Sequence, residues 1–128
     1  MEIIDIIKEH RGKDRELLII SNSEEIFVKP IADFLGIENY IGTRLEVIEG
    51  KFTGKILGDI VYGQNKVNLA KEFTKKNNLN LSNSFAYTDH ISDLSLLLMV
   101  QNPYAINPDK FLFGEAKKRS WPILIFKK

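Results

Sequence analysis

Short apolar runs alternate along the chain with stretches in which apolar residues recur at helical spacing. Residues 17–20 and 84–87 form largely apolar runs between polar or charged neighbours, which predicts strands buried on both faces, as in parallel sheets. Two further short strands are expected at residues 103–106 and 121–126. The periodicity predicts helices over residues 2–10, 24–35, 94–99 and 109–119, and another that carries Lys66 and ends near Lys76.

Capping residues set the expected bounds of the second helix. Ser23 or Asn22 can cap its first turn, and Gly36 can end it in the left-handed conformation that favours glycine. Pro30 is the weak point of this prediction, because a proline inside a helix removes one backbone hydrogen bond. We therefore expect a helix that starts beside Ser23 and runs through Pro30 to Leu35.

The order of the expected elements predicts the fold class. Apolar positions alternate on both sides of Glu49-Gly50, which predicts a β-hairpin over about residues 44–56. Elsewhere strands alternate with helices, which predicts a three-layer α/β fold. Its doubly wound, mostly parallel sheet would lie between two helix layers, with right-handed crossovers joining the strands. With no internal repeat or linker, we expect a single domain over residues 1–128.

Composition narrows the class of protein. The chain has 128 residues, of which 44% are hydrophobic, and a net charge of +1 with both signs scattered. This supports one core and argues against a nucleic-acid surface. The absence of cysteine excludes disulfides and suits a reducing cytosol. The longest apolar run, Leu96–Val100, is too short for a membrane span, and the first residues lack a signal-peptide profile, so we expect a cytoplasmic protein.

Two carboxylates follow the strand at residues 84–87. Asp89 and Asp93 stand at the carboxyl end of that strand, where open α/β sheets bind ligands. Their i, i+4 spacing allows both to approach one hard cation such as magnesium, which takes oxygen ligands. Alternatively, they are the first-turn acids of the following helix and answer its dipole. The spacing alone leaves both interpretations open.

Ser21 and Lys66 are expected near the same edge of the sheet. The hydroxyl of Ser21, with backbone N–H groups at a helix start, and the ammonium of Lys66 would complete a phosphate site beside a carboxylate-held cation. Taken alone, Ser21 could instead be a helix cap, and Lys66 a solvated surface lysine. The joint arrangement favours the phosphate site.

Several motifs between about residue 15 and residue 126 occur together in an order typical of one family. They are Ile19-Ile20-Ser21-Asn22-Ser23, Phe27-Val28-Lys29-Pro30-Ile31-Ala32, Leu35-Gly36-Ile37, Glu46-Val47-x-x-Gly50-x-x-Thr53-Gly54, Gly63-x-x-Lys66, the stretch Ala86–Leu94, Asn107-Pro108-Asp109 and the stretch Ala116–Leu124. With them the chain resembles subfamily IB of the haloacid dehalogenase (HAD) superfamily, the phosphoserine-phosphatase-like hydrolases. The resemblance implies a Rossmann-like core and a magnesium-dependent phosphohydrolase lineage.

The resemblance also implies roles for single residues. Ser21 matches the second family motif, whose hydroxyl binds the transferring phosphoryl group, and Asn22 lies beside it as a phosphate-binding residue. Lys66 matches the third motif, whose ammonium offsets the charge on the phosphate. Asp89 and Asp93 match the fourth, the magnesium-binding acids, with Asp89 binding directly and Asp93 through water. The implied partner is a phosphorylated small molecule.

The chain departs from the family in three ways. No Asp-x-Asp occurs anywhere in it, although the family's nucleophile lies in an N-terminal Asp-x-Asp-x-(Thr/Val) motif; upstream of Ser21 only Asp5 and Asp14 are present, and neither follows an apolar strand. Most of the substrate cap expected between the first two motifs is also missing. Finally, His90 stands where a small residue is expected. The resemblance thus implies a core that is truncated at its N-terminus and lacks the central strand of the sheet.

These departures leave two functions open. One is a phosphatase-lineage core that keeps its phosphate and magnesium residues but is inactive alone, because covalent transfer needs a nucleophile. The other is an interaction module or subunit, completed by a partner chain that supplies the missing strand. An enzyme with an unrelated mechanism is disfavoured, since His10 and His90 are the only histidines and no Ser-His-Asp order is evident. The residues leave open whether the chain is an enzyme, and which substrate it would take.

Two structural expectations follow from the missing motif. Magnesium binding should be weak or absent without the first-motif aspartate. The strand at residues 17–20 should either pair directly with the strand at residues 84–87, or the chain should form a homo-oligomer or bind another chain that covers those edges.

Overall fold

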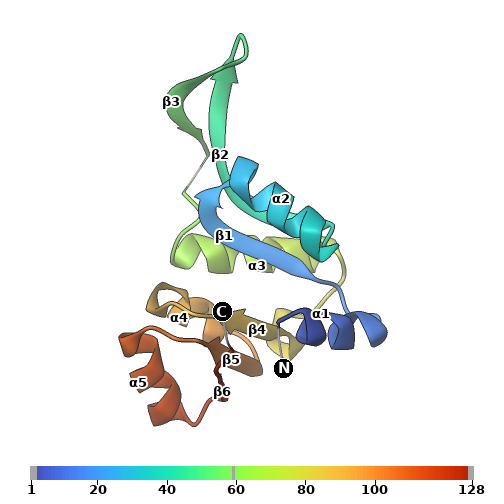
Figure 1. The fold of residues 1–128 in the computed structure, drawn as a ribbon, viewed down its shortest axis with the longest axis vertical. Helices are drawn as coiled ribbons and strands as arrows, with labels where there is room; N and C mark the ends of the chain where they lie inside the picture. The colour runs from blue at the N-terminus through green and yellow to red at the C-terminus, as the bar shows by residue number, and fades with distance from the viewer. Residues whose placement is uncertain (1–2, 59, 127–128) are drawn as a thin grey trace. The chain divides into compact units, whose positions relative to one another are not determined.

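The computed structural model describes residues 3–58 and 60–126, and the chain divides into two compact units, one up to Tyr62 and one from Gly63 (Figure 1). Each unit contains a three-stranded sheet and its own helices. Among the described residues, no helix is both long enough and apolar enough to cross a membrane.

The first unit is built on a mixed sheet with strand order β1-β2-β3. Strands β1 and β2 are parallel and are joined through α2, whereas β2 and β3 are antiparallel and form a hairpin. The elements are α1 (Ile3–Gly12), β1 (Leu18–Glu24), α2 (Glu25–Leu35), β2 (Asn39–Ile48) and β3 (Lys51–Leu57). The helix predicted over residues 2–10 is confirmed for the described residues; residue 2 lies outside them.

Helix α2 runs through Pro30 as predicted and ends at Gly36, whose φ of 69° is left-handed. Val28 and Ala32 of this helix are buried, and this packing sustains the helix despite the hydrogen bond that the proline removes. The expected cap is wrong: the residue before the helix is Glu24, whose side chain makes no capping bond. Strand β1 continues past a register shift after Ile20 as far as Glu24. The two expected capping residues, Asn22 and Ser23, therefore belong to the strand.

The predicted hairpin is confirmed. Val47 pairs with Phe52 and Ile48 with Lys51, so that Glu49 and Gly50 form a two-residue turn. Both turn residues have positive φ, 52° and 78°, which matches the right-handed twist of the flanking strands. The hairpin extends beyond α2 within this unit (Figure 1), and every residue of β3 is exposed.

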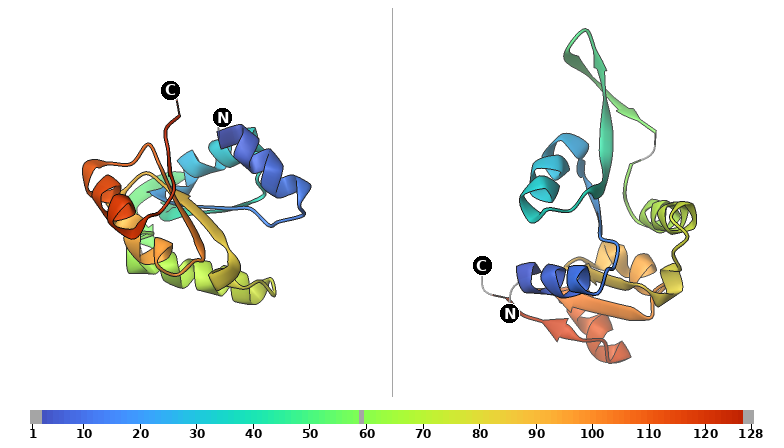
Figure 2. Two further views of the ribbon diagram at one scale, coloured as in Figure 1. Left: turned by 90° about the horizontal axis from the view of Figure 1, so that it is seen from below. Right: turned by 90° about the vertical axis from the view of Figure 1, so that its right-hand side faces the viewer.

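The second unit is a parallel sheet with strand order β4-β5-β6. Strands β4 and β5 lie side by side in the views of Figure 2. The elements are α3 (Gln64–Lys76), β4 (Phe85–Thr88), α4 (Leu94–Leu97), β5 (Asn102–Ile106), α5 (Lys110–Arg119) and β6 (Ile123–Leu124), with 3-10 turns at Leu81–Asn83 and Ile91–Asp93. Leu97, Ala105, Leu112 and Ala116 form its buried core.

The last strand is shorter than predicted. Only Ile123 and Leu124 of the expected run at residues 121–126 pair as a strand. Beyond them the side chain of Asn107 takes over: its Nδ2 donates to the carbonyl of Phe126 at 3.1 Å, and its Oδ1 accepts from the N–H of the same residue at 2.8 Å. The backbone of Asn107 has a φ of 41° and is not in a strand conformation. Its side-chain amide therefore makes the two hydrogen bonds to Phe126 that a strand backbone would otherwise make.

The α/β class with parallel pairing is confirmed, but the strands form two sheets and not one. Within the units, β1 pairs with β2 and β4 pairs with β5. Direct pairing of residues 17–20 with residues 84–87 would join the two units and stays a prediction. Each of the parallel pairs β1–β2 and β4–β5 is closed by a short crossover through one helix, α2 or α4. Strands β1 and β4 thus stand at the ends of their strand orders and are half-buried, not buried on both faces as expected.

Candidate functional site

A buried ion pair lies at the carboxyl end of β4. The ammonium Nζ of Lys66, from the first turn of α3, is 2.8 Å from Oδ1 of Asp93, and both side chains are 10% exposed. The other carboxylate oxygen, Oδ2, accepts a hydrogen bond of 2.5 Å from the hydroxyl of Thr88, the last residue of β4. Lys66, Thr88 and Asp93 therefore form one polar cluster, and Lys66 is not the solvated lysine that its sequence position also allowed.

The ion pair is the main contact of Asp93 Oδ1. That atom is buried and accepts no well-aligned hydrogen bond from the described residues, although the Lys66 ammonium lies 2.8 Å away. Opposite charges at this distance attract strongly in a buried site, so the pair satisfies this oxygen despite the poor angle. Asp93 is thus held at both oxygens by protein groups.

The loop between β4 and α4 carries two more polar side chains of this region, those of His90 and Ser92. His90 Nδ1 accepts from the N–H of Ser92 at 3.0 Å and lies 2.8 Å from its hydroxyl. Since Nδ1 accepts here, the proton of a neutral His90 ring is on Nε2. The N–H of His90 donates to the hydroxyl of Thr88 at 3.3 Å. Local bonds therefore shape this loop as one turn of 3-10 helix.

Asp109, at the start of α5, reaches into this loop. Its Oδ1 accepts from the N–H of Leu112 at 2.7 Å, which caps the helix, and its Oδ2 accepts from the N–H of Ile91 at 2.9 Å. Burial raises the pKa of Asp109, but these N–H groups and the nearby His90, whose Nε2 is 3.6 Å from Oδ2, lower it more, so that the net shift is downward.

Asp89 does not join the cluster. Its carboxylate is exposed and makes no hydrogen bond or ion pair with the described residues, while its carbonyl accepts from the N–H of Asp109 at 2.9 Å. Nowhere in the described chain do three or more acidic, histidine or cysteine side chains gather as a metal site would require. Because Asp93 is engaged at both oxygens, these residues fit a hydrated cation held mainly by Asp89 better than a fully protein-bound one.

Ser21 and Asn22 belong to the first unit. The hydroxyl of Ser21 accepts from the N–H of Ser23 at 3.1 Å, and the carbonyl of Asn22 accepts from the hydroxyl of Thr43. The side chain of Asn22 is exposed, whereas that of Ser21 is partly buried. Their meeting with Lys66 and Asp93, which belong to the second unit, stays a prediction.

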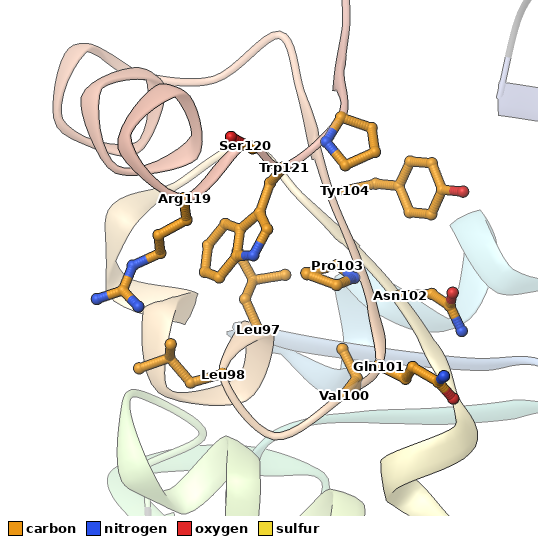
Figure 3. Close-up of a pocket in the computed structure, with 11 residues that line it drawn as sticks. Leu97, Leu98, Val100, Gln101, Asn102, Pro103, Tyr104, Arg119, Ser120 and Trp121 are labelled. Carbon is orange, nitrogen blue, oxygen red and sulfur yellow. The ribbon is translucent and has the colours of Figure 1, made fainter.

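A cavity of about 400 Å³ lies elsewhere in the second unit (Figure 3). Trp121 and Pro103 line it, together with Arg119, whose guanidinium lies 5.5 Å from the Trp121 ring centre. This cavity opens where β5 and β6 begin, and Asp89 and Asp93 follow the opposite end of the neighbouring strand β4. It is therefore separate from the polar cluster.

Comparison with known proteins decides the family. The family model described as haloacid dehalogenase-like hydrolase matches residues 1–98. This chain belongs to the HAD family. The resemblance to the phosphoserine-phosphatase-like group of the HAD superfamily is thereby confirmed.

Relatives of this HAD chain include a histidinol-phosphatase of Neisseria meningitidis serogroup C, 33% identical, with the match covering 95% of the chain and 57% of the relative. A Streptomyces azureus protein named for inhibition of morphological differentiation is 36% identical over 98% of the chain and 45% of its own length. A phosphoserine phosphatase solved as a phospho-aspartyl intermediate analogue superposes with a TM-score of 0.76 at 25% identity, covering 98% of the chain and 57% of that structure. The chain thus spans about half the length of the relatives it matches.

Two contributors to the site were not assigned a role from the sequence. Thr88 lies inside the motif Ala86–Leu94, and its sequence signal is a hydroxyl directly before the first acid, Asp89. Asp109 lay in the Asn107-Pro108-Asp109 motif, where an aspartate before a helix is a recognisable N-cap signal. That its second oxygen reaches the loop after β4 depends on tertiary structure and had no sequence signal.

Proposed function

We propose that this chain is the core of a phosphoserine-phosphatase-like HAD phosphohydrolase that keeps phosphate- and magnesium-binding side chains but is inactive alone. The observation that carries the proposal is the buried contact between Lys66 and Asp93 in a chain of this family that has no Asp-x-Asp motif. Burying a lysine and an acid at a strand end is costly, and such groups concentrate at functional sites.

Each residue has a role in this proposal. The hydroxyl of Ser21 and the neighbouring Asn22 bind a phosphate group, and the ammonium of Lys66 offsets its negative charge. Asp89 holds magnesium directly and Asp93 through water, in line with the exposed carboxylate of the first and the engaged carboxylate of the second. Magnesium, when bound, supplies electrostatic stabilisation of the phosphoryl oxygens.

Catalysis is what the chain lacks. Covalent phosphoryl transfer requires a nucleophile that attacks phosphorus and an acid that protonates the leaving oxygen. In the family both come from Asp-x-Asp, and no such pair occurs in this sequence. The substrate class is a phosphomonoester of a small molecule, in keeping with the names of the histidinol-phosphatase and phosphoserine phosphatase relatives.

A phosphatase assay tests this proposal directly. The purified chain, incubated with p-nitrophenyl phosphate and magnesium, should release no nitrophenol above background. Turnover of about 1 per second or more, an ordinary enzyme value, would contradict it. A Lys66→Met variant prepared in parallel identifies contamination, because weak activity from a host phosphatase persists in that variant.

Magnesium affinity tests the second part of the proposal. Calorimetry should show weak binding that is lost in Asp89→Ala, since Asp89 is the accessible carboxylate. Asp33→Ala is a matched control, because Asp33 is an exposed acid of the first unit that forms an ion pair with Lys29. Sub-micromolar affinity, or binding unchanged by Asp89→Ala, would contradict the assignment.

A second candidate function is a subunit completed by another chain. It is favoured by the strand orders, in which β1 and β4 are each an end strand. A separate polypeptide carrying an apolar strand with Asp-x-Asp-x-Thr should then bind this chain and restore hydrolysis, whereas the same polypeptide with both aspartates changed to asparagine should bind without restoring it. DNA upstream of Met1 that encodes such a motif in frame would instead indicate a fragment of an ordinary hydrolase.

A further inference from the structure

Three consecutive residues after β4 contact Asp109. Its N–H donates to the carbonyl of Asp89 at 2.9 Å, its Oδ2 lies 3.6 Å from Nε2 of His90, and the same oxygen accepts from the N–H of Ile91 at 2.9 Å. We propose that Asp109 is a positioning residue that holds the loop over residues 89–93 in the shape needed to present Asp89 to a cation. This inference rests on the proposed metal role of Asp89.

The two carboxylate oxygens of Asp109 accept hydrogen bonds from two different segments, α5 and the loop after β4. A helix cap needs one acceptor, and Oδ1 supplies it to the N–H of Leu112 at 2.7 Å. Serine or asparagine would cap α5 equally well. The second oxygen, Oδ2, accepts from the N–H of Ile91, which lies outside the helix. An aspartate at this position is therefore explained by its bond to the loop, because the helix cap alone does not require one.

The loop is held at two ends. At its far end Asp93 is fixed by Lys66 and Thr88. At its near end the Asp89 side chain is exposed and makes no hydrogen bond or ion pair with the described residues, so its position depends on the backbone that Asp109 holds. Groups behind a metal ligand commonly change affinity by roughly 10- to 100-fold when removed, because a mobile ligand must be ordered on binding.

Asp109→Ser isolates the second oxygen. Serine retains a capping hydroxyl for the N–H of Leu112 and the backbone bond to Asp89, but it has no second oxygen for Ile91. Asp109→Ala removes the cap as well. Asn80→Ala is the matched control, because Asn80 Oδ1 accepts from the N–H of Ser82 at 3.0 Å in the same way, at the 3-10 turn before β4.

The first measurement uses metal-free protein. Amide hydrogen exchange by NMR should show the N–H of Ile91 exchanging roughly tenfold faster or more in Asp109→Ser, because a bond to a charged acceptor is lost. The N–H of Leu112 should keep its protection in that variant, and Asn80→Ala should leave Ile91 unchanged. Unchanged exchange of Ile91 in both Asp109 variants would overturn the inference.

The second measurement is a magnesium titration of the same proteins by calorimetry. Asp109→Ser should weaken binding roughly tenfold, whereas Asn80→Ala should not. Equal affinity in Asp109→Ser and the unsubstituted chain overturns the positioning role. Faster exchange of Ile91 in Asp109→Ser, combined with no magnesium binding by the unsubstituted chain, supports the loop clamp and instead refutes the proposed metal function, so the two failures are distinguishable.

Discussion

Single residues in the polar cluster show how charge is accommodated inside the second unit. Lys66 and Asp93 are both nearly buried, and each is the counter-ion of the other at 2.8 Å. An uncompensated buried charge costs several kcal/mol, whereas the intact pair is close to neutral relative to apolar residues of similar size. The pair therefore contributes little net stability, and we attribute its presence to a functional role at the carboxyl end of β4.

Breaking this pair should destabilise the second unit. Lys66→Met leaves Asp93 buried without its counter-ion, and we expect a loss of about 3 kcal/mol in the free energy of unfolding, measured by urea denaturation. The double variant Lys66→Met/Asp93→Leu should recover most of that loss, since no buried charge remains. A double variant less stable than Lys66→Met would show that the pair itself is strongly stabilising.

Gly42 is required by a close backbone approach in the first unit. A Cβ atom at this position would lie 2.8 Å from the Cα of Glu25 and 3.0 Å from the carbonyl oxygen of Ser23. Gly42→Ala should therefore lower the free energy of unfolding by about 1–3 kcal/mol, because backbone atoms must move. Gly12→Ala, where a Cβ would meet nothing within 4 Å, should be neutral or slightly stabilising. Equal losses in both variants would refute the steric explanation.

The site residues differ in how far the sequence could predict them. Motif order singled out Lys66 and Asp93, which lie in contact, but it did not predict their ion pair. The separate position of Asp89 could not be predicted from the i, i+4 spacing. That spacing brings side chains together only on a regular helix. Here residues 91–93 form a 3-10 turn and α4 starts only at Leu94, so Asp89 lies before the first helical turn.

At the scale of elements, α1 carries a buried titratable group. His10 is 7% exposed, and Arg15 Nη1 lies 3.0 Å from its Nδ1. An arginine can only donate, so Nδ1 accepts and the ring is neutral. Burial and the charges of Arg15 and Lys13 lower the pKa of His10, and Glu9 opposes them. The folded state therefore takes up this proton less readily than the unfolded chain.

This downward shift predicts a loss of stability in mild acid. As the pH falls below about 6.5, the unfolded chain protonates His10 while the folded chain does not, so the unfolded state is favoured; the loss levels off once the folded state also binds the proton. Urea denaturation at several pH values should show this decrease. His10→Gln, which keeps an acceptor for Arg15, should reduce it, and an identical pH dependence in that variant would refute the assignment.

Element types followed from the sequence pattern more reliably than element ends. The Glu49-Gly50 turn and the stop at Gly36 were predicted because only special backbone conformations fit there. The start of α2 differs from the prediction by one residue, but its capping residue was wrong, because β1 bulges after Ile20 and runs on to Glu24. Such a bulge depends on pairing with β2, which a local pattern does not contain.

At the scale of the whole molecule, motif order predicted the family and the fold class, whereas the partition of strands between sheets was not predictable. An apolar run predicts that a strand is covered by other parts of the protein, but it does not predict which segment covers it. Residues 17–20 and 84–87, both apolar on both faces, are predicted either to pair with each other or to be covered by another segment. Each is an end strand of its own unit's strand order. Which segment covers an end strand is set by tertiary contacts and partners.

The first unit also exposes an apolar face on α2. Ile26, Phe27, Ile31 and Phe34 are between 54% and 83% exposed, and their spacing places them on one side of the helix, opposite the buried Val28 and Ala32. A contiguous apolar surface of this kind is uncommon on monomers and usually marks an interaction site. In a pure sample the available partner is a second copy, so we predict that the chain self-associates through this face.

Sedimentation velocity over a wide range of concentration tests this association. The average mass should rise with concentration, and Phe34→Glu should shift the sample towards monomer, because a charge buried in an apolar contact is strongly unfavourable. Phe111→Glu is the matched control: that residue is 69% exposed on α5, which belongs to the second unit, and its substitution should leave the mass unchanged. A chain that stays monomeric at all concentrations would contradict the prediction. Equal effects of the two substitutions would also contradict it, since they would indicate general apolar adhesion and not a defined surface.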